Sequence, residues 1–196
     1  MKKIAIVGNG KFTKDQSFFI DNCDFVVRFN ECKNFGDMCG HKTDVLCINN
    51  TGAPIDRINE KKSILNAPFY QSFSELWFPR NKNIHELNTN GDFTDKSKSL
   101  LDVNFLSDRS LVYFSYDLNK FVFWILKKVS GKKLRKMKCP STGFFGICYV
   151  LSSYRFSDYE KYILGFNFRG ADSHNWKIEK IVVEILSRRF NRFHIM

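Results

Sequence analysis

The stretch that decides the fold reads IAIVGNGKFTKDQSFFIDNCDFVVRFNECKNFGDMCGHKTD over residues 4–44. It opens with the apolar run Ile4–Val7, which ends at the turn Gly8–Gly10. Apolar residues then recur at helical spacing over Phe12–Ile20, and a second apolar run follows at Phe25–Phe29. This order predicts a β-α-β unit whose parallel strands are joined right-handed. A glycine turn at such a strand end lets backbone amides approach a phosphate.

Two common phosphate-binding patterns fit this stretch poorly. A dinucleotide-binding GxGxxG turn needs a third glycine, where Thr13 stands, and an acidic residue closing the second strand. That strand instead ends Arg28-Phe29-Asn30. A P-loop needs lysine directly after its last glycine, but the segment Gly40–Thr43 places a histidine between them and has no strand before it. The residues therefore disfavour both patterns.

Three groups of residues, in order along the chain, resemble the motifs of the CMP-sialic acid-dependent sialyltransferases of glycosyltransferase family 29. The large sialyl motif is matched by Val7-Gly8-Asn9, Ile20-Asp21, Asp24, Val27-Arg28-Phe29-Asn30 and Gly40-His41-Lys42-Thr43. The small motif resembles Pro140-Ser141-Thr142-Gly143 and Leu164-Gly165-Phe166, and the very small motif resembles His174 with Glu179. The resemblance covers about residues 4–48 and 138–186.

This resemblance implies a fold and an activity. The expected fold is α/β, a Rossmann-like single domain over residues 1–196 of the sialyltransferase variant of GT-A. The expected reaction is an inverting transfer of a 3-deoxy-ulosonic acid, sialic acid or Kdo, from its CMP-activated donor to a glycan acceptor. The resemblance implies no metal and no cofactor besides the donor. Two features depart from the family: the chain is shorter than the animal catalytic domains, and no His-Tyr motif lies between Phe168 and His174.

The resemblance also assigns site residues. His174 would be the general base, and an imidazole pKa of ~6.5 suits that task near neutrality. Glu179 would lie about 140° around a helix from His174, so we interpret it as structural or as a contact to the acceptor. Ser141 and Thr142 are residues typical of a helix start, whose free amides attract a phosphate. The expected donor-binding residues are Gly8, Asn9, Gly10, Asn30, Ser141, Thr142, Gly143 and Gly165.

The charge of the chain predicts anionic partners. Lysine and arginine number 31 against 20 aspartate and glutamate residues, which gives a formal net charge of +11. Positive residues gather after the aromatic run Phe121–Leu126, over 127–138, and again at Arg188, Arg189 and Arg192. This pattern favours peripheral binding to an anionic membrane and a lipid-linked acceptor such as lipopolysaccharide. The alternative is a non-catalytic Rossmann-like protein that binds anions or nucleic acid; for the transferase, no nucleic-acid partner is expected.

The compartment is expected to be the cytoplasm. No apolar run approaches the roughly 18 residues of a membrane span, and the apolar run after Lys3 is too short for a signal peptide. The six cysteines form no CxxC pair and have no histidine at zinc spacing, so free buried thiols are expected. Animal sialyltransferases carry a disulfide-bonded cysteine before the first strand; Lys2 and Lys3 stand there instead, which suits a reducing compartment.

Further elements are expected along the rest of the chain. Short apolar runs predict strands at 45–48, 63–65, 76–78 and 159–166, and residues 80–98 are expected to form a polar loop or flap. Residues 100–129 read as mostly buried helix, and a capped apolar helix is expected from Ser141 to Leu151. The last predicted helix, residues 174–190, would bury Ile178, Ile181, Val182, Ile185 and Leu186.

Overall fold

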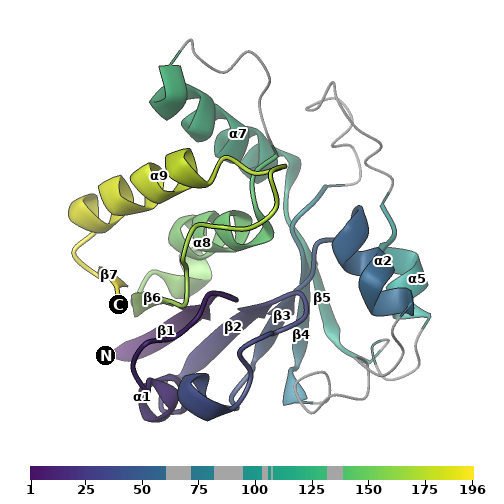
Figure 1. Cartoon of the computed structure of the whole chain (residues 1–196), viewed down its shortest axis with the longest axis horizontal. Coiled ribbons are helices and arrows are strands. Elements are labelled where there is room, and N and C mark those ends of the chain that lie inside the picture. Colours follow the sequence, from purple (N-terminus) through teal and green to yellow (C-terminus); the bar gives the residue numbers. More distant parts are fainter. Residues whose placement is uncertain (61–71, 82–94, 103–105, 107, 132–138) are drawn as a thin grey trace.

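The computed structural model describes residues 1–60, 72–81, 95–102, 106, 108–131 and 139–196. Its centre is a parallel sheet of seven strands in the order β5-β4-β3-β2-β1-β6-β7 (Figure 1). The strands are β1 (Lys2–Val7), β2 (Phe25–Phe29), β3 (Val45–Cys47), β4 (Glu75–Phe78), β5 (Ser110–Tyr113), β6 (Tyr159–Leu164) and β7 (Phe193–Ile195). The predicted α/β, Rossmann-like fold is confirmed.

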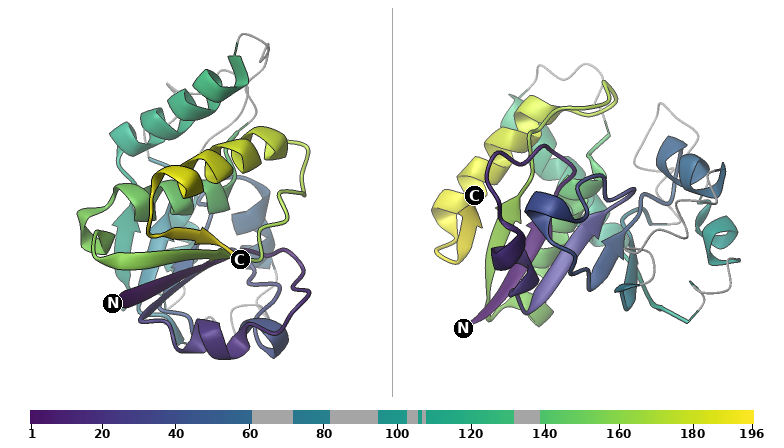
Figure 2. Two further views of the ribbon diagram at one scale, coloured as in Figure 1. Left: turned by 90° about the vertical axis from the view of Figure 1, so that its left-hand side faces the viewer. Right: turned by 60° about the horizontal axis from the view of Figure 1, so that its bottom comes forward.

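Helices cover both faces of this sheet. One face carries α7 (Tyr116–Ser130), α8 (Thr142–Ser152) and α9 (Trp176–Arg189) (Figures 1 and 2). The opposite face carries α1 (Ser17–Asp21), α2 (Ala53–Glu60) and α5 (Ser97–Leu101). Single 3₁₀ turns lie at η1 (Asp37–Cys39) and η4 (Tyr154–Phe156). The result is a three-layer α/β arrangement.

The continuous apolar run of β1 follows from its central place in the sheet. Ile4 and Ile6 pack under α7, α8 and α9, whereas Ala5 and Val7 pack against the layer that contains α1. All four side chains are buried. A strand covered on both faces has no polar side, which is why the sequence shows a run rather than an alternation.

The direction of winding reverses between β1 and β6. From β1 the chain adds β2, β3, β4 and β5 outward on one side, then returns to place β6 and β7 on the other side of β1. In an open parallel sheet a crevice forms where the strand order reverses, outside the carboxyl ends of the strands. The turn Gly8–Gly10 and Gly165 lie at this position, since they directly follow β1 and β6.

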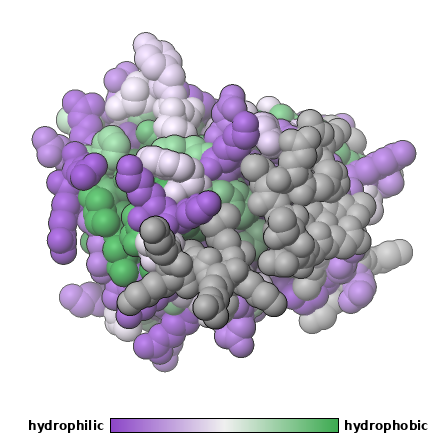
Figure 3. All heavy atoms as spheres, turned by 90° about the horizontal axis from the view of Figure 1, so that it is seen from above, coloured by the Kyte–Doolittle hydropathy of each residue, from purple (hydrophilic) through white to green (hydrophobic). Residues whose placement is uncertain are grey.

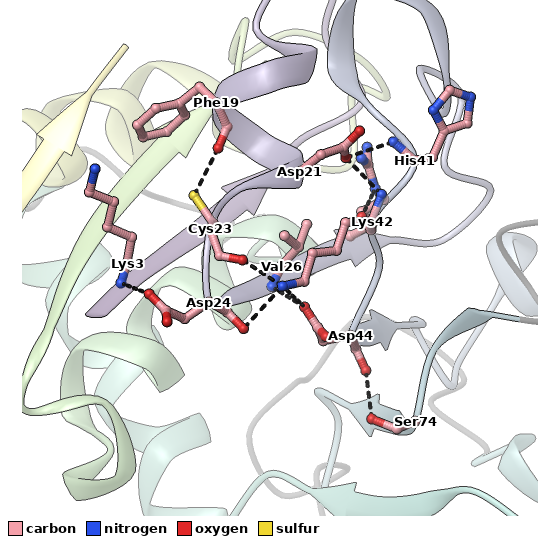
Figure 4. Close-up of polar contacts among 11 residues, drawn as sticks. Lys3, Phe19, Asp21, Cys23, Asp24, Val26, His41, Lys42, Asp44 and Ser74 are labelled. Carbon is pink, nitrogen blue, oxygen red and sulfur yellow. Dashed lines mark hydrogen bonds and ion pairs between the residues drawn. The ribbon is translucent and has the colours of Figure 1, made fainter. Parts of the chain in front are cut away.

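Several residues of the large-motif resemblance hold the loop that follows β2. The buried guanidinium of Arg28 donates to the carbonyls of Cys39 (2.6 Å), Gly40 (3.0 Å) and Lys42 (3.0 Å). Asp21 Oδ1 accepts from the amides of His41 and Lys42, each at 2.8 Å (Figure 4). These side chains therefore bind backbone groups and position the loop.

Two expectations about secondary structure were wrong, one strand was missed, and one expectation about burial was wrong. Helix α1 starts only at Ser17, because Asp15 Oδ1 accepts from both the amide and the hydroxyl of Ser17 and turns the chain there. The stretch 100–129 is not mostly buried helix, since β5 pairs with β4 inside it. Its helix, α7, is capped by Ser115, whose Oγ accepts from Leu118 N at 3.1 Å. The edge strand β7 was not expected at all.

The fourth error concerns which side of α9 is buried. Ile185 is 37% exposed, whereas Glu179, Val182 and Val183 are buried. The apolar pattern predicted a buried side of α9 that is slightly rotated from the observed one. The reason is that a buried glutamate is not expected on the core side of a helix. The expected strand 63–65 and residues 82–94 of the expected loop lie outside the described residues. All six cysteines are free thiols, as predicted.

Within the ranges that the structure describes, no helix has the length and apolar character needed to cross a membrane.

Candidate functional site

A cavity of about 550 Å³ opens at the carboxyl ends of the central strands. Its wall comes from the turns after β1, β2, β3, β4 and β6, from the start of α8 and from the loop before α9. The structure brings every predicted site residue to this one cavity: Gly8, Asn9, Gly10, Asn30, Ser141, Thr142, Gly143, Gly165 and His174. They come from segments far apart in the sequence, so the fold assembles the site.

The glycines at the end of β1 shape the cavity rather than offer their amides to it. Gly8 N donates to Leu164 O at 2.8 Å, and Gly10 N donates to Gly165 O at 2.7 Å. A Cβ on Gly8 would lie 2.5 Å from Gly165 O, which is closer than atoms can approach. These two amides therefore point at the end of β6 and the turn that follows it. Glycine is required at both positions because the turns after β1 and β6 pack backbone against backbone.

Two asparagines join the ends of neighbouring strands at the cavity wall. Asn9 Nδ2 donates to Phe29 O at 3.0 Å, and Asn9 Oδ1 accepts from Lys33 N at 3.0 Å. Asn30 lies in the left-handed region with φ 49°, and its Oδ1 accepts from Asn49 N at 2.9 Å. Asparagine tolerates that backbone region better than most residues. Asn9 keeps a second N–H on Nδ2, so it can bind a ligand without releasing Phe29.

The start of α8 is held by Glu179 of α9. Ser141 N donates to Glu179 Oε1 at 2.8 Å, and Ser141 Oγ donates to Glu179 Oε2 at 2.6 Å. Ser141 Oγ also accepts from Phe144 N at 3.1 Å, which makes it the expected helix cap. The Ser141 donors are thus engaged within the protein. The amides of Thr142 and Gly143, in the first turn, have no acceptor inside the helix and are the groups left for a ligand.

Glu179 is a buried carboxylate with a structural role. Its side chain is on the buried side of α9 at 1% exposure. Burial raises the pKa of Glu179, while the two bonds from Ser141 and the nearby charge of Arg80 oppose that rise. This agrees with the structural interpretation of Glu179, which is not among the residues that line the cavity.

His174 lies in the loop that precedes α9. Its Nδ1 is 2.7 Å from the carbonyl oxygen of Cys139. A carbonyl can only accept, so Nδ1 carries the proton and Nε2 holds the lone pair in the neutral ring. The ring also packs edge-on against Trp176, with centroids 4.9 Å apart. These contacts set the tautomer and the orientation of the ring at the cavity wall.

Arg80 is a cavity residue that the sequence did not identify. It follows β4, is 2% exposed, and donates from Nη2 to Pro140 O at 2.7 Å. Its guanidinium carbon lies 4.3 Å from the centroid of the Phe145 ring. Nε and Nη1 have no hydrogen-bond partner among the described residues. Leaving buried donors unpaired costs about 1–3 kcal/mol each, and more for a charged group.

The charged residues around the cavity are mostly basic. Among the described residues of the wall, Glu31 is the acidic one. Its Oε1 lies 2.6 Å from Arg57 Nε, and its Oε2 lies 3.5 Å from Lys33 Nζ. The basic side chains in the wall are Lys33, Arg57, Arg80 and Arg169. In the part of the chain that is described, no three His, Cys, Asp or Glu side chains gather as a metal site. The wall therefore favours an anionic ligand.

The overall fold is similar to that of solved sialyltransferases. The whole chain aligns with a mammalian sialyltransferase at a TM-score of 0.60 and 17% identity, covering 68% of that chain. It also aligns with the sialyltransferase CstII from Campylobacter jejuni in complex with CMP-3FNeuAc (TM-score 0.58, 15% identity, 81% covered) and with cytidine-5'-monophosphate (0.56, 15%, 79%). At this level of identity the likeness establishes the fold.

Comparison at the level of sequence is more limited. No family model matches the chain. A segment of 51 residues is 43% identical to the urease operon 23 kDa accessory protein of Rhizobium meliloti. That segment is 26% of this chain and 23% of the relative, so it spans about a quarter of each protein.

Proposed function

We propose that the chain is a single-domain inverting glycosyltransferase that transfers a 3-deoxy-ulosonic acid, sialic acid or Kdo, from its CMP-activated donor to a glycan acceptor. One observation carries this proposal: the Gly8–Gly10 turn, Asn30, the start of α8 and His174 all line the same cavity. The support from comparison is the shared fold with CstII, which has been solved with CMP and with a CMP-sugar analogue.

In the proposed reaction, one part of the cavity activates the acceptor hydroxyl and another part stabilises the departing CMP. His174 Nε2 removes the proton of the acceptor hydroxyl, and the acceptor oxygen attacks the anomeric carbon from the face opposite the phosphate. The bond between the anomeric carbon and the phosphate oxygen breaks, and CMP leaves with the bonding electrons. The first amides of α8 and the helix dipole stabilise the negative charge on the departing group. The positive charge that this step needs would come from the protein, with no metal or cofactor.

We further propose that the acceptor is linked to a lipid. On α7 the aromatic side chains of Phe121 and Trp124 are 42% and 53% exposed, and Lys128 Nζ lies 5.0 Å from the centroid of the Trp124 ring. Figure 3, a view from above, has hydrophobic patches among hydrophilic side chains on the side where Figure 1 places α7 and α9. Exposed aromatic residues beside lysines are typical of surfaces that rest on anionic lipid. Residues 132–138 of the basic run lie outside the described residues.

Calorimetry tests the donor specificity of this proposal. CMP and CDP should bind in the presence of EDTA, with higher affinity than AMP or NAD. A preference for NAD, or binding that appears only after a divalent metal is added, would refute the transferase proposal. Binding of nucleic acid with no affinity for CMP would favour the non-catalytic alternative.

A further inference from the structure

We infer that Arg80 is an oxyanion-binding residue of the cavity, whose guanidinium receives a phosphate or carboxylate group of the ligand next to the first turn of α8. This inference deepens the proposed function and rests on it for the identity of the ligand. Arg80 is a buried cation that has no role in the proposed reaction as described above.

The position of Arg80 is set by its backbone. Arg80 N donates to Asn50 Oδ1 at 3.0 Å, and Asn50 Nδ2 donates to Arg80 O at 3.0 Å. Asn50 is completely buried and also donates to Asp95 Oδ1 at 2.8 Å. This reciprocal pair holds the start of the side chain beneath the cavity. Arg80 therefore stays in the interior, although a long cationic side chain would ordinarily extend into solvent.

The protein uses only part of the guanidinium. Pro140 O accepts from Nη2, and the guanidinium carbon lies over the Phe145 ring, 4.3 Å from its centroid. The charges and dipoles around it are those of Glu179 and the thiols of Cys139 and Cys47, and the Cys139 thiol, a weak acceptor, also interacts with the guanidinium. Both oxygens of Glu179 are already engaged by Ser141, and the Cys139 and Cys47 thiols have a pKa raised by burial, so they stay neutral near pH 7. The N–H groups on Nε and Nη1 are left without an acceptor among the described residues.

The surroundings favour an oxyanion as the acceptor. Pro140, which Arg80 binds, comes directly before the helix cap Ser141, so the guanidinium lies beside the positive end of α8. Arg80 lines the cavity together with Thr142 and Gly143, whose amides belong to the first turn. A planar guanidinium matches a carboxylate or a phosphate with two parallel bonds. Two independent features, a helix start and a buried arginine with unused donors, thus meet at one wall of the cavity.

The test replaces Arg80 by Met, which keeps the contact with Phe145 but removes the charge and the donors. Calorimetry would measure cytidine, CMP and a CMP-ulosonic acid. We expect CMP to bind Arg80→Met about 10- to 100-fold more weakly than wild type, as expected for losing hydrogen bonds to a charged group. Cytidine, which has no oxyanion, should bind both proteins equally. A loss seen only with the CMP-ulosonic acid would assign Arg80 to the carboxylate rather than the phosphate.

Arg155→Met is the matched control, since Arg155 also stacks on a phenylalanine but pairs with Glu75 outside the cavity. If Arg80→Met does not fold, Arg80→Lys keeps the charge without the planar pair of donors and should still lose affinity several-fold. Unchanged affinity for CMP and for the CMP-ulosonic acid in either folded Arg80 variant would overturn the inference.

Inorganic phosphate separates this inference from the proposed function. Phosphate should raise the melting temperature of wild type more than that of Arg80→Met. If wild type binds no cytidine nucleotide but phosphate still stabilises it through Arg80, the donor proposal fails and the oxyanion site stands. If phosphate stabilises both proteins equally while wild type binds CMP, the oxyanion site fails and the donor proposal stands.

Discussion

Both carboxylate oxygens of Glu179 accept hydrogen bonds from Ser141, one from its backbone amide and one from its hydroxyl. This pair joins the first turn of α9 to the start of α8. A second link runs alongside it, because Cys139 N donates to Ser173 O at 3.0 Å while His174 Nδ1 donates to Cys139 O. The start of α8 and the loop that carries His174, the proposed base, are thus held as one unit.

The buried charge of Glu179 predicts an unusual dependence of stability on pH. Burial raises the pKa of Glu179, so the folded protein holds this proton more tightly than the unfolded chain. The contribution of Glu179 to stability therefore rises as the pH falls from above the raised pKa toward the ordinary glutamate value of about 4.3. The difference in melting temperature, wild type minus Glu179→Gln, should increase as the pH is lowered from 8 to 5. A difference that stays constant or decreases would contradict this.

The packing of Gly8 against the turn after β6 predicts a cost for the smallest side chain. In Gly8→Ala the new Cβ would meet a backbone oxygen, Gly165 O, which cannot move aside as a side-chain tip can. We expect a loss of about 1–3 kcal/mol in the free energy of unfolding, measured in urea. Lys11→Ala is the control: this exposed residue lies in the same loop, so shortening its side chain should cost far less. Equal losses in both variants would contradict the packing argument.

Asn30 is expected to contribute to donor binding through its side chain. Asn30→Gly suits this test better than alanine, because glycine adopts φ 49° without strain. Removing the amide should weaken CMP binding about 2- to 10-fold, the range expected for one hydrogen bond. Calorimetry measures this directly. CMP affinity equal to wild type would remove Asn30 from the donor-binding residues.

The proposed lipid-linked acceptor predicts that α7 contributes to membrane binding. Wild type should co-sediment with anionic vesicles at low salt and be released by high salt. Replacing Lys127 and Lys128 by Gln should weaken binding, since each lysine near an anionic surface contributes about 1 kcal/mol. Lys14 and Lys98, exposed residues in the segments that form the opposite layer, should tolerate the same change without effect. If the two double substitutions have the same effect on vesicle binding, or if wild type does not bind vesicles at all, α7 is not a membrane-binding surface.

The parts of the fold and site that the sequence predicted are those encoded locally. Strand β1 and the turn Gly8–Gly10 are visible because an apolar run and its glycine turn are adjacent in the chain. The cap at Ser141 is visible for the same reason, since cap and helix are contiguous. The edge strands β5 and β7 are short and lack a clear alternation, so their pairing depends on neighbours that only the folded sheet supplies.

The parts that the sequence missed depend on distant contacts. Arg80 stands in a polar stretch and reads as a solvated side chain, but Asn50, Pro140 and Phe145 enclose it in the fold. Glu179 is interpreted from the resemblance as structural or as an acceptor contact, but its burial follows from its bonds to Ser141, which the sequence does not reveal. For both residues, a charged side chain predicts exposure at the surface. Only the contacts with residues distant in the sequence explain why the side chain is buried.

The most direct test of the central claim is mass spectrometry of acceptor glycans after incubation with CMP-sialic acid or CMP-Kdo. Wild type should add one ulosonic acid residue to an acceptor and release CMP, with EDTA present. His174→Ala should lower the turnover about 10²- to 10⁴-fold, as expected for loss of a general base, while CMP affinity stays within a few-fold. His41→Ala, outside the cavity wall, should retain turnover. Undiminished transfer by His174→Ala, or no transfer by wild type from either donor, would contradict the account.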